Sequence, residues 1–386
     1  MAEWVERKIS DIGTVIGGAT PSTKKLENYE NGKIAWITPK DLSAFSGRYI
    51  ERGERNITEI GLKSCSTQLL PPNTVLFSSR APIGYVAIAA NEVCTNQGFK
   101  SVIPNENTAP LFLFYLLKYN KDKIEGMGSG TTFKEVSGNT MKNIVVNVPS
   151  DKKVQEKIAT ILGSIDDKIE ENERINNNLE QQAQAIYQQM FIDNARSNWA
   201  EGTLSDIADI TMGQSPSGSS YNEDGTGTIF FQGRAEFGFR FPSVRLYTTE
   251  PKRMALSNDT LMSVRAPVGD LNVAHMDCCI GRGLAAIHSK SHHQSFVLYT
   301  MFSLKKQLDV FNGEGTVFGS INRNSLNDMP ILIPSYDILD EFERTVAPMD
   351  LTIRNNYDEN CRLQDIRDTL LPRLMSGELD ASDIDL

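Results

Sequence analysis

The sequence predicts an α+β protein made of two copies of a strand-rich lobe, each followed by one long helix. Three observations predict this fold class. A heptad pattern occurs twice, short phrases recur at a nearly constant offset, and β-branched runs lie between Gly, Pro and Asn residues. With 386 residues, the chain is long enough for two or three domains with cores of their own.

The first long helix is predicted for residues 155–191, a polar run with few helix-breaking residues. Its seam residues recur at alternating steps of three and four, which is typical of a coiled coil of about four heptads, roughly 55 Å long. The same seam returns 184 residues later, including both of its asparagines. The seam consists of Leu162, Ile165, Ile169, Asn172, Asn176, Leu179, Ala183, Ile186 and Met190, and then of Val346, Met349, Ile353, Asn356, Asn360, Leu363, Arg367, Leu370 and Leu374.

One seam position differs between the two copies, because Arg367 stands where the first helix has Ala183. A plain apolar contact is excluded there. We expect Arg367 to pair with a carboxylate such as Glu180, Asp365 or Glu173, or to lie on a surface that meets a partner.

The lobes repeat as well. Ser-Asp-Ile at 10–12 returns at 205–207, Trp4 corresponds to Trp199, and residues 18–22 correspond to 213–217, all at an offset of 195. At an offset of 185, the Arg-Ala-Pro phrase at 80–84 returns at 265–269, and matching phrases lie at 128–131 and 313–316 and at 148–150 and 333–335. The chain is therefore a tandem duplication in which the first copy has about ten extra residues between 22 and 80.

Within the first lobe, alternating or β-branched runs predict strands at 33–38, 74–78, 85–89 and 143–148. Apolar runs of helical length lie at 110–119 and, in the second lobe, at 295–304. We expect four segments: a lobe over 1–150, a helix over 151–194, a lobe over 195–336, and a helix with an acidic tail over 337–386.

The net charge of −10 is unevenly distributed. Residues 151–191 and 337–386 together carry −11, and the remaining residues carry +1, so the lobes themselves are nearly neutral. Five cysteines without paired spacing are typical of reduced thiols, and no signal peptide or membrane-length apolar run is present. We expect a cytoplasmic protein without a membrane partner.

No convincing catalytic constellation is found, and we expect no cofactor and no metal. The chain has no Walker-type or dinucleotide-binding glycine loop. His275, Cys278, Cys279 and His288 match structural zinc spacing poorly, and the first lobe has no histidine, so no histidine chemistry is duplicated. Residues 166–168 imitate a nuclease Asp-x-Lys element, but on a helix, where a solvated face is the better interpretation.

In this order, the phrases resemble the specificity (S) subunit of type I restriction–modification enzymes. They are "KISDIG…GGATPS", "IAWITPKDL", "SSRAPIGYVAI", "CTNQGFKSV" and "GSGTT…NIVVNVPS…QEKIATILGSIDDKI" in the first half. In the second half they are "LSDIADITMGQSPS", "SVRAPVGDLNV", "GRGLAAI" and "LLPRLMSGELD". The resemblance covers nearly the whole chain.

The resemblance implies two target-recognition domains, each reading one half of a bipartite, asymmetric double-stranded DNA target. It implies that the two helices pack together, that the molecule is pseudo-two-fold, and that the helices hold the modification (methyltransferase) subunits, two in number. It also implies that the chain is not itself an enzyme. Methyl transfer from S-adenosylmethionine belongs to the modification subunits, and ATP-driven translocation and cleavage belong to restriction subunits in the full complex.

Pseudo-two-fold symmetry favours an antiparallel helix pair, in which Asn172 and Asn176 would meet Asn360 and Asn356. Buried asparagines there would lower stability but fix the register, and with it the distance between the lobes. Two lobes on one face of DNA should be about one helical turn, roughly 34 Å, apart.

Arginine, lysine and glutamine suit base edges, whereas Gly/Ser/Thr turns suit phosphates. The DNA-binding candidates are Lys40, Arg80, Gln97, Lys100, Ser129 and Thr131 in the first lobe, and Gln232, Arg234, Arg265, Arg282 and Thr316 in the second. For each of them, a purely structural role in a turn remains an alternative.

Two other functions are weighed against this one. A self-contained nuclease or methyltransferase would need a cofactor or metal motif, and methyltransferase activity of the chain alone would favour it. A protein-only coiled-coil adaptor would fail to bind duplex DNA even with modification subunits present.

Overall fold

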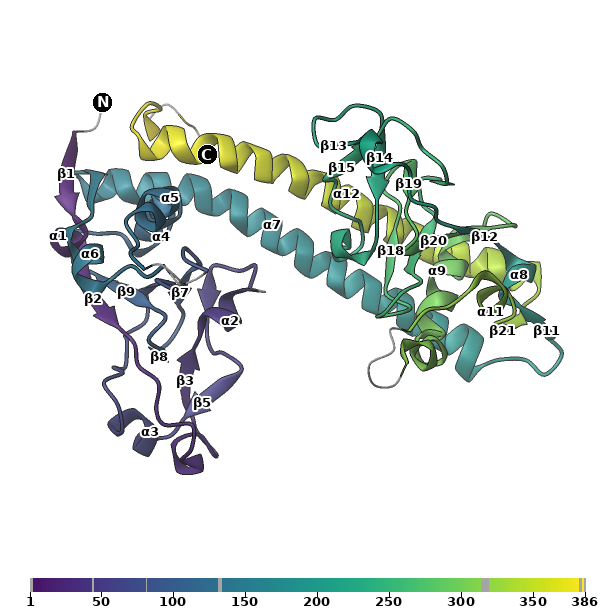
Figure 1. The fold of residues 1–386 in the computed structure, drawn as a ribbon, viewed down its shortest axis with the longest axis horizontal. Coiled ribbons are helices and arrows are strands. Elements are labelled where there is room, and N and C mark those ends of the chain that lie inside the picture. The colour runs from purple at the N-terminus through teal and green to yellow at the C-terminus, as the bar shows by residue number, and fades with distance from the viewer. Residues whose placement is uncertain are drawn as a thin grey trace. The chain divides into compact units, whose positions relative to one another are not determined.

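The computed structural model describes residues 3–43, 45–80, 82–130, 134–313, 319–381 and 384. Contacts divide the chain into two units: unit 1 is Met1–Glu171 with Glu359–Leu386, and unit 2 is Asn172–Asp358. Each unit contains one strand-rich lobe and a part of each of two long helices, α7 (Lys152–Tyr187) and α12 (Tyr336–Met375) (Figure 1). The prediction of a mixed helix and strand protein with long helices is confirmed.

Lobe 1, the part of unit 1 outside α7 and α12, contains three sheets. β1 (Trp4–Lys8) pairs with β10 (Val145–Pro149). The five-stranded sheet has the order β2 (Gly13–Gly17), β9 (Lys100–Pro104), β6 (Val75–Phe77), β7 (Val86–Ala89), β4 (Tyr49–Ile50), and the three-stranded sheet has the order β5 (Arg55–Ile57), β3 (Ile34–Ile37), β8 (Val93–Thr95). Its helices are α1 (Ile9–Ile12), η1 (Leu26–Asn28), α2 (Pro39–Ser43), α3 (Glu59–Lys63), α4 (Pro110–Tyr119), α5 (Lys121–Gly126) and α6 (Gly138–Asn143).

Lobe 2, the part of unit 2 outside α7 and α12, repeats this plan. β11 (Ala200–Thr203) pairs with β21 (Pro330–Ile333). One sheet has the order β12 (Ala208–Met212), β20 (Leu284–Ser289), β17 (Thr260–Ser263), β18 (Leu271–Val273), and the other has the order β13 (Tyr221–Asn222), β15 (Leu246–Thr248), β14 (Thr228–Phe231), β19 (Cys278–Ile280), β16 (Met254–Ala255). Its helices are α8 (Leu204–Ile207), η3 (Gly218–Ser220), η4 (Arg234–Glu236), α9 (Gln294–Ser303), α10 (Lys305–Leu308), η5 (Asp309–Asn312) and α11 (Arg323–Asn327).

The predicted elements are present. The four strands expected in the first lobe are β3, β6, β7 and β10, and the two apolar runs are α4 and α9. The repeated Ser-Asp-Ile phrase forms the one-turn helices α1 and α8. The Asp11 carboxylate accepts the Lys8 amide at 2.9 Å, and Asp206 accepts the Thr203 amide at 2.7 Å, which satisfies an amide at each helix start.

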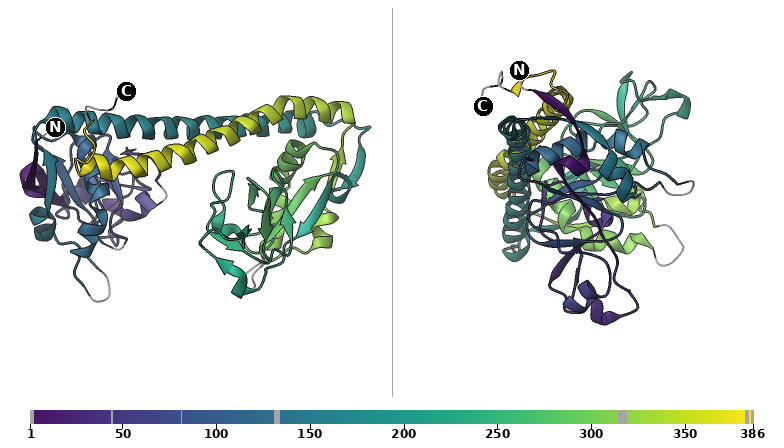
Figure 2. Two further views of the ribbon diagram at one scale, coloured as in Figure 1. Left: turned by 90° about the horizontal axis from the view of Figure 1, so that it is seen from above. Right: turned by 90° about the vertical axis from the view of Figure 1, so that its left-hand side faces the viewer.

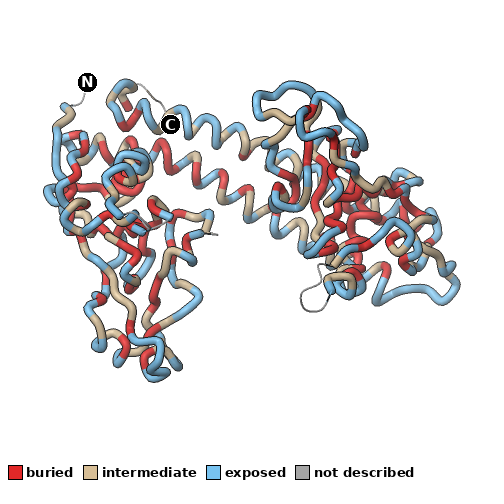
Figure 3. The backbone as a smooth tube through the Cα atoms, in the orientation of Figure 1, coloured by how far each residue is buried: buried red, intermediate tan, exposed pale blue. Residues whose placement is uncertain are grey.

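The long helices differ slightly from the prediction. α7 begins at Lys152, three residues earlier than expected. After α7 ends at Tyr187, the helix continues as a π-helical segment, η2 (Gln188–Asp193). All of the predicted seam residues are buried or half-buried, and exposed residues alternate with them along both helices (Figure 3). The alternation follows the 3.6-residue helical period.

Within each unit the segments of α7 and α12 run antiparallel. In unit 2, the Asn356 side chain donates to Asn176 Oδ1 at 2.9 Å, and Asn176 donates to the Ile353 carbonyl at 3.4 Å. This Asn176–Asn356 contact is the one expected from the seam. In unit 1, Asn360 donates to the Ile169 carbonyl at 3.4 Å. Amide groups at apolar seams therefore find partners on the facing helix, which disfavours slipped registers.

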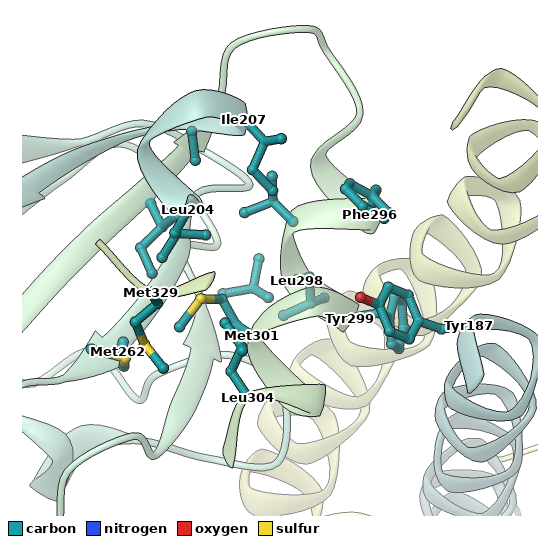
Figure 4. Close-up of a cluster of buried hydrophobic side chains, with 14 of the residues drawn as sticks. Tyr187, Leu204, Ile207, Met262, Phe296, Leu298, Tyr299, Met301, Leu304 and Met329 are labelled. Atoms are coloured by element: carbon teal, nitrogen blue, oxygen red, sulfur yellow. The ribbon is translucent and has the colours of Figure 1, made fainter. Parts of the chain in front are cut away.

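Each lobe shares its hydrophobic core with the helices of its own unit. In unit 2, Tyr187 of α7 and Phe296 of α9 both belong to the core (Figure 4), with their ring centroids 5.9 Å apart. The ring of Phe342 on α12 packs edge-on against both. In unit 1, Leu162 of α7 and Leu374 of α12 belong to the core that surrounds α4. Since burying each large apolar side chain contributes about 1.5–3 kcal/mol, lobe and helices stabilise each other.

The segment after α12 folds back beside the start of the chain in unit 1 (Figure 2). Gly377 has φ +77°, and a Cβ atom there would lie 2.6 Å from Trp4 Nε1. In the described part of the chain, no helix is long and apolar enough to cross a membrane.

Candidate nucleic-acid interface

The Arg-Ala-Pro phrase forms the same serine-closed turn in both lobes. In lobe 1, Ser78 Oγ donates to the Pro82 carbonyl at 2.9 Å and accepts the Tyr85 amide at 2.8 Å. The turn ends at Gly84, whose φ of +98° is a conformation that side chains with a Cβ rarely adopt. Residue 81 lies outside the described residues.

Lobe 2 repeats each of these contacts. Ser263 Oγ donates to the Pro267 carbonyl at 2.6 Å and accepts the Asp270 amide at 2.9 Å, and Gly269 has φ +83°. The arginine at the start of each turn is also held through its backbone. Arg80 forms an isolated antiparallel β-bridge with Glu135, and Arg265 forms one with Ser320. The repeated phrase is thus required by the turn, and the turn presents an arginine at its first position.

In lobe 2, four of the predicted candidates line one pocket. The pocket has a volume of about 230 Å³ and is lined by Gln232, Arg234, Arg265 and Arg282 together with Ser215, Gly233, Ser263, Ala266 and Gly283. These residues come from loops that are far apart in the sequence, and the amide of Arg282 donates to Ser215 Oγ at 3.3 Å. The three arginines that line it are all exposed.

In lobe 1, the corresponding loops bring together Arg80, Lys100 and Ser129 around Glu135. Glu135 pairs with Arg80 Nε at 3.0 Å and with Lys100 Nζ at 3.5 Å, and its backbone bonds to that of Ser129 in both directions. Gln97 hydrogen-bonds to Thr20. Gln97 and Arg282 are equivalent positions at the offset of 185, because the Ser79 amide donates to the Gly98 carbonyl at 2.7 Å just as the Val264 amide donates to the Gly283 carbonyl at 2.9 Å.

Lys40 and Arg234 are equivalent as well. The Asn96 amide donates to the Ile37 carbonyl at 3.0 Å, and the Gly281 amide donates to the Phe231 carbonyl at 2.8 Å, which aligns β3 with β14 at an offset of 194. Lys40 and Arg234 each stand three residues after these carbonyls. Because the offset is 194 here and 185 at Arg80, nine of the ten extra residues of the first copy lie between residues 40 and 80.

Two of the candidates, Thr131 and Thr316, lie outside the described residues. The placed candidates differ in their carboxylate partners. Lys40 pairs with Glu54 at 2.8 Å, and this hydrogen bond and charge raise the pKa of Lys40. Arg234 pairs with Asp270, which also pairs with Lys305 at 3.1 Å.

Sequence reasoning missed a buried arginine that joins each lobe to the helices. In unit 2, Arg240 is 4% exposed, and its Nη2 atom lies 2.9 Å from Glu180 of α7. Its Nη1 atom donates to Asp350 of α12 at 3.2 Å, and the Tyr299 hydroxyl donates to the same carboxylate at 2.8 Å. Burial raises the pKa of Glu180, and the guanidinium of Arg240 counteracts this only in part.

Unit 1 contains an equivalent arginine, Arg48, which is 6% exposed. The Ile88 amide donates to the Arg48 carbonyl at 2.7 Å, just as the Val273 amide donates to the Arg240 carbonyl at 2.8 Å. Arg48 pairs with Asp167 and, at 3.0 Å, with Glu170, both on α7. Each arginine fixes how its lobe sits on the helices of the same unit.

Two expectations from the sequence are only partly right here. Arg367 pairs with carboxylates, as expected, but they are Asp166 at 3.0 Å and its neighbour Asp368 rather than Glu180, Asp365 or Glu173. Asp166 does not lie on a solvated face; it is 6% exposed and accepts the Tyr115 hydroxyl at 2.5 Å. The repeat contained a signal for this, because Tyr115 and Asp166 recur as Tyr299 and Asp350, both 184 residues later.

The histidines and cysteines of lobe 2 form no metal cluster. Among the described residues, no group of three or more His, Cys, Asp or Glu side chains could hold a metal ion. His275 pairs with Asp358 at 2.6 Å and His288 with Asp259 at 2.6 Å, while Cys278 and Cys279 are buried in β19. Burial raises the pKa of the Cys278 thiol to about 12, so it stays protonated.

Comparisons with known proteins give a consistent result. The family model described as type I restriction modification DNA specificity domain matches residues 1–181. The specificity subunit of the type I restriction enzyme MjaIX of Methanocaldococcus jannaschii is 33% identical, over 98% of this chain and 94% of that one. The putative MjaX specificity subunit of the same organism is 27% identical over the same shares.

The fold agrees with these relatives. The crystal structure of the type I restriction–modification S subunit from M. genitalium has a TM-score of 0.64 at 16% identity, and the match covers 97% of this chain and 96% of that chain. The identity to the MjaIX subunit over nearly the full length is well above what chance allows. The chain therefore belongs to the family of type I restriction–modification specificity subunits.

Proposed function

We propose that this chain is the sequence-specific DNA-recognition subunit of a type I restriction–modification system, in which each lobe reads one half of a bipartite, asymmetric target. The observation that carries the proposal is the repeated convergence of loops. In both lobes three segments meet: the serine-closed turn, the loop after β2 or β12, and the turn before β9 or β20. They present exposed basic or amide side chains. These side chains suit base edges and phosphates.

The two lobes carry different side chains at equivalent positions, which supports an asymmetric target. Gln97 corresponds to Arg282 and Lys100 to Ala285, while the turns that hold them are the same. Glutamine forms its best bidentate pair with adenine, whereas an arginine at the equivalent position can bind guanine or a phosphate. Different bases are therefore expected in the two half-sites.

The long helices act as the spacer. The segments 1–150 and 195–336 are the recognition domains, and 151–194 with 337–386 form an antiparallel, pseudo-two-fold coiled coil. The asparagine contact in unit 2, the Asn360 contact in unit 1 and the buried arginines support a fixed register. The acidic, exposed outer faces of α7 and α12 dock two modification subunits, and restriction subunits join in the full complex.

The chain is not itself an enzyme in this proposal. Among the described residues, the buried carboxylates at α7 and α12 are engaged by Arg240, Arg367 and tyrosine hydroxyls, which leaves them unsuited to acid–base work. Chemistry belongs to the partner subunits, which would act on DNA in the cytoplasm. Five free cysteines agree with such a reducing compartment.

Methylation profiling tests this function. The chain and its modification subunits are expressed in a host without restriction systems, and methylated bases are mapped across the genome. We expect one motif with two unlike halves and a gap of fixed length. Methylation that is absent, or that follows the same motif when this chain is omitted, overturns the proposal. Methyltransferase activity of the chain alone overturns its non-catalytic role.

A further inference from the structure

The candidate cations of the two lobes differ in one respect that the function does not explain. Arg80 and Lys100 share the carboxylate of Glu135. In lobe 2, the position equivalent to Glu135 is Ser320, since the backbone of Ser320 forms a β-bridge with Arg265 just as the backbone of Glu135 does with Arg80. Within the described residues, which exclude 314–318, no carboxylate lies within ion-pair distance of Arg265 or Arg282.

Glu135 is held in place by its backbone. Its amide donates to the Ser129 carbonyl at 2.9 Å, and the Ser129 amide donates back at 3.0 Å. The next residue, Val136, is buried and donates its amide to the Ser79 carbonyl at 2.9 Å. Partial burial alone would raise the pKa of Glu135. The hydrogen bond to Arg80 and the charges of Arg80 and Lys100 outweigh this and hold the pKa of Glu135 below its ordinary value. Glu135 is therefore a fixed, ionised partner at neutral pH.

Glu135 pairs with Arg80 through the Nε atom, 3.0 Å from Glu135 Oε2. The two terminal Nη groups of Arg80 donate no hydrogen bond to a described residue. Those two groups form the fork that pairs with O6 and N7 of guanine. Lys100, in contrast, has a side chain that is only 14% exposed, and its stem passes along Gly17 and Gly138.

We infer that Glu135 is a specificity-determining residue. It orients Arg80 toward a guanine of the first half-site and keeps Arg80 and Lys100 from binding phosphates. In lobe 2, Arg265 and Arg282 bind phosphates. The inference rests on the proposed function. A phosphate at Arg80 would meet the negative charge of Glu135, whereas a base edge is uncharged and can share the guanidinium with it. Arg265 and Arg282 meet no such repulsion from the described residues.

The two roles have different salt dependence. Each phosphate contact contributes about 0.9 to the slope of log K against log salt, which is about a 3.5-fold change in affinity between 50 and 200 mM salt. A contact to a base edge contributes discrimination between bases but no such slope. Arg265→Ala and Arg282→Ala should therefore each reduce the slope, while Arg80→Ala should mainly reduce the preference for guanine.

The test uses Glu135→Gln in the complex with modification subunits, and fluorescence anisotropy with three duplexes. One carries the target found by methylation profiling, one has the guanine of the first half-site replaced, and one is unrelated. Glu135→Gln should raise affinity for the unrelated duplex, steepen the salt slope by about 0.9 per released cation, and lower the guanine preference by about fivefold or more. The matched control is Glu92→Gln, which removes the same charge from an exposed position directly before β8.

Several results would overturn the inference: equal effects of Glu135→Gln and Glu92→Gln, a first half-site without guanine, or a Glu314→Gln variant that raises non-specific affinity as much as Glu135→Gln does.

Failure of the proposed function would give a different set of results from failure of this inference. If Arg80→Ala and Arg265→Ala both leave DNA binding unchanged, the interface itself is wrong. If Arg80→Ala weakens target binding while Glu135→Gln changes nothing, only the role of Glu135 is wrong.

Discussion

Replacing Arg240 with alanine should loosen lobe 2 from the helices of unit 2. Glu180 and Asp350 would keep their buried positions, with side-chain exposures of only 16% and 21%, but lose their cation. Removing one partner of a buried ion pair costs about 3–5 kcal/mol, and we expect the lower end because both carboxylates retain some water contact. The Tyr299 hydroxyl still donates to Asp350 in the variant.

Hydrogen exchange measured by mass spectrometry can report the loss of stability in each unit separately. At about 1.4 kcal/mol per tenfold change, a loss of about 3 kcal/mol speeds exchange through unit-2 opening roughly 10²-fold. Peptides from α9 should show it and peptides from α4 should not. Arg48→Ala is the matched control, since its partner Asp167 is 70% exposed and remains hydrated after the change, so the lost ion pairs should cost only about 1 kcal/mol.

The effect of Arg240→Ala should depend on pH. Burial already raises the pKa of Glu180 above 4.5, and loss of the Arg240 charge raises it further. A carboxyl whose pKa is raised in the folded state favours folding below its unfolded value, and this contribution is lost as pH rises through the folded value. The deficit should therefore be smaller at about pH 5 than at about pH 8. Equal deficits at both pH values, or equal effects in α4 and α9, would refute the buried-pair reasoning.

Two further predictions concern the helices and the chain ends. The double change Asn176→Leu and Asn356→Leu should stabilise unit 2 but allow more than one gap length in the methylated motif, because the amide contact that fixes the register is lost; a single unchanged gap contradicts this. Gly377→Ala should destabilise unit 1 by about 1 kcal/mol or more and shift Trp4 fluorescence, because φ is positive and the new Cβ meets the indole. Gly126→Ala, with open space around it, should change neither, and equal shifts in both variants would count against the tail contact.

Much of the fold could be predicted because local patterns fixed it. The heptad spacing predicts α7 and α12, and the β-branched runs predict β3, β6, β7 and β10. The offset between repeats also brought the correct turns into correspondence, since the contacts of Ser78 and Ser263 are the same. These features depend on residues that are near in sequence or repeated in register.

The buried contacts could not be predicted in this way. Arg48 and Arg240 lie 192 residues apart, an offset that neither the early nor the late phrases share, so no repeated phrase marks them. The partner of Arg367 depends on the register of two antiparallel helices and on Tyr115 from the lobe, which together bury Asp166. Likewise, the equivalence of Lys40 and Arg234 emerges only from the pairing of β3 with β8 and of β14 with β19.

The central claim is that each lobe reads one half of the target while the helices set the gap. Its most direct test is a chimera in which residues 195–336 are replaced by the corresponding lobe of a relative with a different target, followed by methylation profiling. We predict a motif in which one half changes to that of the relative, while the other half and the gap length stay the same. A chimera that methylates a motif with both halves changed, or with a different gap, would contradict the account.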